Sequence, residues 1–129
     1  MLIQPNEVMD ALRPLSDAVY RTEGTIEDGY ARFCSVFYDP RFQEYLYDLV
    51  KSGLAVDNPD IQEKTLTRYG AICGDVIALG ASVFNGRREL PDLIRDIIAD
   101  LQVLEPLRHS IRREFNEHPP KFFAPLRQQ

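Results

Sequence analysis

Apolar residues recur every three or four positions along most of this chain, which is the spacing of one buried face of an α-helix. No segment shows the strict alternation of apolar and polar residues that is typical of a half-buried β-strand. The pattern predicts an all-α fold, a single-domain bundle of five to seven helices over residues 1–116. Helices are expected over about 6–22 with a kink at Pro14, 26–38, 40–52, 59–85 and in two segments after 91.

The stretch 59–85 is the longest expected helix, and it carries apolar residues on two sides. Asn58 can cap its start, and Asn85-Gly86 offers a left-handed stop at its end. A helix with large residues on one side and small residues on another is usually buried on both, so we expect this one at the centre of the bundle. The large residues are Ile61, Tyr69, Ile72, Val76 and Val83, and the small ones are Gly70, Gly74, Ala78 and Ala81.

A proline-rich tail over residues 117–129 is expected to be extended. Pro119, Pro120 and Pro125 block a regular helix there. The tail nevertheless carries Phe122, Phe123 and Leu126, which either cover the protein's own domain or bind a partner.

Charge is distributed unevenly along this chain of 129 residues with a net charge of −5. Residues 1–60 hold five basic and eleven acidic side chains, whereas residues 61–129 hold ten and nine. So acidic a chain argues against nucleic-acid binding over a broad face, and its acidic half would suit a protein partner with a basic surface. Near the C-terminus, Arg108, Arg112 and Arg113 form a candidate basic patch.

Candidate catalytic, metal and cofactor sites are not evident in the sequence. His109 and His118 each follow a glutamate by four residues, but neighbouring arginines and prolines argue against a metal site. Cys34 and Cys73 lie in apolar helical patterns, which predicts reduced, inert thiols and a cytoplasmic protein. No secretory signal or membrane-spanning segment is expected. We therefore predict neither an enzyme nor a cofactor.

Asp75 is the one charged residue between Tyr69 and Gly86, and it must reach the surface or meet a specific partner. The surface is the interpretation that we favour. Asp100 is expected on the solvent side of its own helix.

The aromatic run FYDPRFQEYLY, residues 37–47, favours a function in protein binding. Some of its rings must lie off the buried stripe, and exposed aromatic residues flanked by charges are typical of interaction surfaces. We predict a small helical protein that acts by protein–protein binding, as an adaptor, an inhibitor of the immunity type or an assembly subunit. Its partner is another protein, with homo-oligomers included. The predicted partner-binding residues outside the tail are Tyr38, Arg41, Phe42 and Tyr47.

One local pattern of about twenty residues resembles phycobiliproteins. It consists of Tyr69, Gly74-Asp75, Leu79, Asn85-Gly86, Arg88 and Glu89, similar to the tyrosine, GD, leucine and NG-x-R-E residues that follow the bilin site in that family. The resemblance implies a globin-like arrangement of helices and, as an alternative function, a ligand-binding or sensory domain. Val56–Asp60 contains no cysteine for covalent attachment of a bilin.

Overall fold

The computed structural model describes residues 1–119, and every regular element in that range is an α-helix. The predicted all-α fold and single helical domain are confirmed. The expected tail lies almost wholly outside the described residues, and α7 still includes Glu117. The helices are α1 (Pro5–Ala11), α2 (Arg13–Tyr20), α3 (Ile26–Phe37), α4 (Pro40–Ala55), α5 (Pro59–Asn85), α6 (Leu90–Gln102) and α7 (Leu104–Glu117).

Side-chain caps fix the starts of three of these helices. The Thr25 hydroxyl accepts a hydrogen bond from the Asp28 N–H at 3.1 Å, and the Asp39 carboxylate accepts one from the Arg41 N–H at 2.8 Å. Asn58 accepts from two N–H groups at the start of α5. Each cap satisfies backbone donors that the first helical turn leaves without a partner.

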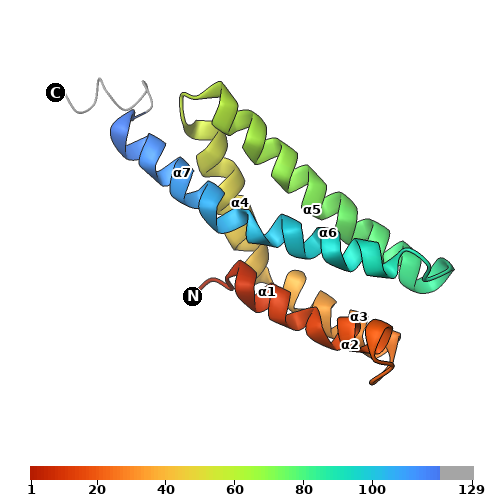
Figure 1. Cartoon of the computed structure of the whole chain (residues 1–129). Helices are drawn as coiled ribbons and strands as arrows, with labels where there is room; N and C mark the ends of the chain where they lie inside the picture. The colour runs from red at the N-terminus through yellow and green to blue at the C-terminus, as the bar shows by residue number, and fades with distance from the viewer. Residues whose placement is uncertain (120–129) are drawn as a thin grey trace.

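Helix α6 lies between two groups of helices. It packs against α5 on one side and against α1 and α2 on the other, and it continues into α7 (Figure 1). Helix α4 crosses the molecule and packs against α5 and α7, while α3 packs against α1 and α2. Helix α5 therefore lies along one edge of the molecule in Figure 1, where its partners α3, α4, α6 and α7 cover only part of its surface.

Only one face of α5 is buried, which corrects the expectation of a helix buried on two sides. An added Cβ at Gly70 or at Gly74 would have no heavy atom of the described residues within 4 Å, so none of the seven helices packs against these two glycines. Gly80 is different, because a Cβ there would lie 2.5 Å from the Tyr30 hydroxyl. The buried residues of α5 are Thr65, Ile72, Val76, Leu79 and Val83.

An aromatic cluster forms the core where α3 meets α4. The Phe42 ring stacks on Tyr45 with centroids 5.7 Å apart and lies 5.6 Å from the Phe37 ring, which in turn stacks on Phe33. Phe42 is completely buried. Its assignment as a partner-binding residue is therefore wrong, because its side chain points into the core and packs against the Phe37 ring of α3.

Candidate interaction surface

Large apolar side chains are exposed along one face that α3, α4 and α5 share, which we call the outer face. Phe84 and Ile77 on α5 are 71% and 70% exposed, and Tyr47 on α4 is 65% exposed. Full burial of one such side chain stabilises a protein by roughly 1.5–3 kcal/mol, so binding of a partner over the outer face is favourable. The exposed residues of the outer face are Tyr38, Tyr47, Leu66, Tyr69, Ile77 and Phe84.

Contacts between neighbouring side chains make the outer face continuous. Tyr47 and Tyr69 line one shallow hollow between α4 and α5, together with the half-buried Val50. At the other end, the Phe84 ring meets the Tyr30 ring edge-on with centroids 6.0 Å apart. The face therefore extends from α4 along α5 to its C-terminal turn.

Tyrosine hydroxyls and cysteine thiols lie together in the middle of the outer face. A hydrogen bond with Cys34, followed by burial, raises the pKa of Tyr30 to about 12. A hydrogen bond with Cys73 raises the pKa of Tyr69 in the same way. Burial, followed by the nearby Cys34 and Cys73 thiols, raises the pKa of Tyr38. These tyrosines are therefore uncharged near neutral pH, and the face stays apolar.

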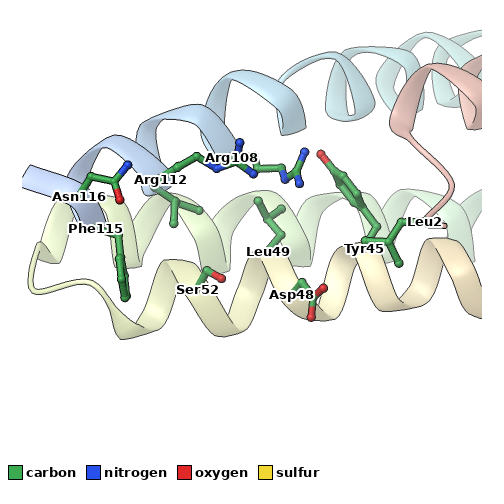
Figure 2. Close-up of a pocket in the computed structure, with 10 residues that line it drawn as sticks. Leu2, Tyr45, Asp48, Leu49, Ser52, Arg108, Arg112, Phe115 and Asn116 are labelled. Carbon is green, nitrogen blue, oxygen red and sulfur yellow. The ribbon is translucent and has the colours of Figure 1, made fainter. Parts of the chain in front are cut away.

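A cavity of about 350 Å³ lies between α4 and α7 on another side of the molecule (Figure 2). The Arg108 guanidinium extends over the Tyr45 ring, 5.6 Å from its centroid, and the Tyr45 hydroxyl donates a hydrogen bond to Glu105 at 2.9 Å. Burial, followed by this hydrogen bond, raises the pKa of Tyr45. Arg112 also lines the cavity, whereas Arg113 is exposed outside it, so the cavity divides the basic patch expected from the sequence.

Of the predicted partner-binding residues, Tyr38 and Tyr47 lie on the outer face and Arg41 does not. The Arg41 guanidinium pairs with Asp39 at 3.0 Å, and its backbone carbonyl accepts from the Ile3 N–H, which places it beside the N-terminal segment. Phe122, Phe123 and Leu126 lie outside the described residues. Leu66, Ile77 and Phe84 on the exposed side of α5 were missed, although their spacings of 11 and 7 residues return to one face of a helix and were a usable signal.

Asp75 finds a specific partner, which the sequence did not identify. It hydrogen-bonds with Asp100 on α6, with Arg68 and Asp96 nearby. One oxygen of Asp100, Oδ2, is buried without a hydrogen-bond partner in the described part of the chain. Burial, followed by the hydrogen bond and charge of Asp75, raises the pKa of Asp100 to about 7.

Among residues 1–119, no group of three or more histidine, cysteine, aspartate or glutamate side chains is arranged so that it could hold a metal ion, and no helix has the length and apolar character needed to cross a membrane. No family model, curated protein or solved structure matches the chain. The globin-like arrangement therefore stays a hypothesis.

Proposed function

We propose that this protein acts by binding another protein chain, as an adaptor or assembly subunit, and that the outer face is the surface that the partner covers. The observation that carries the proposal is the row of exposed apolar side chains on α5, extended by Tyr47 of α4 and Tyr38 at the end of α3.

The size of the outer face supports the proposal. If a whole aromatic side chain presents about 200 Å², then Tyr38, Tyr47, Tyr69 and Phe84 together expose roughly 450 Å². Leu66 and Ile77 extend that area further. Apolar patches larger than a few hundred Å² are rare on monomers and mark interaction sites, and tyrosine and phenylalanine are enriched in such sites.

Apolar burial, not charge, would hold the partner. Between Leu66 and Phe84, the charged residues of α5 are Arg68 and Asp75, and both lie near Asp100 of α6. The net negative charge of residues 1–60 would still influence the rate at which the protein and its partner associate, because long-range electrostatic attraction or repulsion acts before contact.

Site-specific photo-crosslinking in the cells that make the protein tests this proposal. A benzoylphenylalanine in place of Ile77 should give a discrete adduct with one polypeptide, which mass spectrometry can identify. The same residue in place of Asp92, which is exposed on α6, is the matched control and should give none. Absence of an adduct at Ile77, Phe84 and Tyr47 alike would contradict the proposal. A visible absorption band in the purified protein would favour the ligand-binding alternative.

A further inference from the structure

On the basis of the proposed function, we infer that the partner on the outer face is a second copy of this chain, with the two α5 helices packed antiparallel across a two-fold axis beside residue 75. In this arrangement, two residues that face each other across the interface have numbers that add up to about 150. A two-fold interface uses the same patch on both subunits, so the patch must be complementary to itself. The following features of α5 meet that requirement.

The middle of α5 offers a knob and a matching hole. Gly70, Cys73, Gly74 and Ile77 stand at positions i, i+3, i+4 and i+7, the four residues that surround a hole on a helix surface. Ile77 of the second copy would lie opposite Cys73, directly over that hole. The two glycines leave the space open, since a Cβ at either would meet no atom of residues 1–119 within 4 Å. By symmetry, the second copy would receive Ile77 of the first.

The ends of the apolar row match as well. Leu66 would lie opposite Phe84 of the second copy, and this pair occurs twice. Eighteen residues separate them, so the row is about 27 Å long at 1.5 Å per residue. Tyr47 and Tyr38 stand beside the row and would flank the helix of the second copy. The four rings expose roughly 450 Å², and Leu66 and Ile77 add to it, so the outer face supplies more than half of the roughly 800 Å² per partner of a stable interface.

Opposite charges lie just beyond the two ends of the row. Glu63 is exposed about one turn before Leu66, and Arg88 lies just after α5, where it lines a hollow together with Ala81 and Asn85. Neither forms an ion pair within residues 1–119. In the antiparallel pair, Glu63 would lie next to Arg88 of the second copy, whereas in a parallel pair like charges would meet. The charges therefore favour the antiparallel orientation.

Disulfide crosslinking of the purified full chain tests the register. In a Cys34→Ala, Cys73→Ala background, the Leu66→Cys, Phe84→Cys variant should oxidise to a covalent dimer, because a disulfide requires Cα atoms within about 7 Å. Leu66→Cys alone should give at least about tenfold less dimer, since the two copies of residue 66 would be about 27 Å apart. Asp92→Cys on α6 is a control for random collisions. Efficient crosslinking of Leu66→Cys alone would overturn the antiparallel arrangement.

A charge-reversal cycle measured by sedimentation tests the contact at the ends. Glu63→Arg and Arg88→Glu should each raise the dimer Kd by about five- to tenfold, because each reversal acts at two symmetric pairs. The double variant should recover most of the affinity, and Lys64→Glu, on another side of α5, should leave the Kd unchanged. Failure of the double variant to recover would refute the pairing of Glu63 with Arg88.

The two proposals fail in different ways. A purified chain that stays monomeric at high concentration, combined with an adduct between Ile77 and a different polypeptide in cells, would overturn the homodimer and leave the proposed function intact. A monomeric chain without any adduct on the outer face would overturn both.

Discussion

Asp100 provides the sharpest test of the electrostatics, because replacing it by asparagine should stabilise the protein at alkaline pH. Its carboxyl group is half-buried against Asp75, and its Oδ2 is buried without a partner in the described residues. Burial, the hydrogen bond with Asp75 and the charges of Asp75 and Asp96 raise its pKa to about 7, against an opposing effect of Arg68. The folded protein therefore holds a proton on Asp100 that the unfolded chain releases near pH 4.

The sign and size of the effect follow from this difference in proton binding. A raised pKa in the folded state means that the group's contribution to stability is full below about pH 4 and is lost as pH rises through about 7. At 1.36 kcal/mol per pKa unit, the difference would reach about 4 kcal/mol for a fully shielded group. Asp100 is only partly buried, so solvent screening reduces our expectation to about 1 kcal/mol.

Urea unfolding at pH 5 and pH 8 measures the effect. The wild-type protein should lose about 1 kcal/mol more than Asp100→Asn between these two values, because the amide keeps a hydrogen bond to Asp75 without a titrating charge. Asp48→Asn removes an exposed carboxylate elsewhere and should show the wild-type pH dependence. If Asp100→Asn were no more stable than the wild type at pH 8, the assignment of a raised pKa to Asp100 would be wrong.

Three further predictions concern the packing of α5 and its cap, each measured by urea unfolding. Gly53→Ala should lower the free energy of unfolding by about 1–3 kcal/mol, because the new Cβ would overlap the buried Thr65 side chain; an unchanged value would show that the contact yields easily. Gly74→Ala should raise the stability of the monomer by up to about 1 kcal/mol, since the site is open and alanine favours helix; a loss would show hidden packing there. Asn58→Ala should cost about 1 kcal/mol, because its side chain accepts from the Asp60 and Ile61 N–H groups, whereas Asn58→Asp should be nearly neutral.

Local chemistry explains which parts of the fold could be predicted from the sequence. The start of α5 after Asn58 and of α3 after Thr25 depends on hydrogen bonds within three residues, so the capping residue is sufficient to locate it. The break expected near Pro14 is present at Leu12, between α1 and α2. These features do not require knowledge of the tertiary structure.

Contacts between distant segments explain the failures. Phe42 and Tyr47 belong to one aromatic run on one helix, and only the position of α3 decides that the first is buried while the second is exposed. Asp100 lay on the expected solvent side of α6 by periodicity, but α5 brings Asp75 against it. A side chain's distance from another helix depends on how the two helices cross, which one helix's pattern does not contain.

The burial of helix α5 also depends on contacts that its own sequence pattern does not contain, and here the difference bears on function. Its two apolar stripes made burial on both sides the natural expectation, yet α3, α4, α6 and α7 contact only part of its surface, and α1 and α2 pack against α3 and α6 instead. Within the monomer, Gly70 and Gly74 each cost about 1 kcal/mol of helix propensity relative to alanine and gain no close contact in return. Ile77 beside them is exposed, so the monomer also lacks the free energy that burial of its side chain would contribute. All three costs are offset if a second helix seats its own large side chain over the glycines, so the two-sided pattern fits an α5 whose second side is covered only in an assembly.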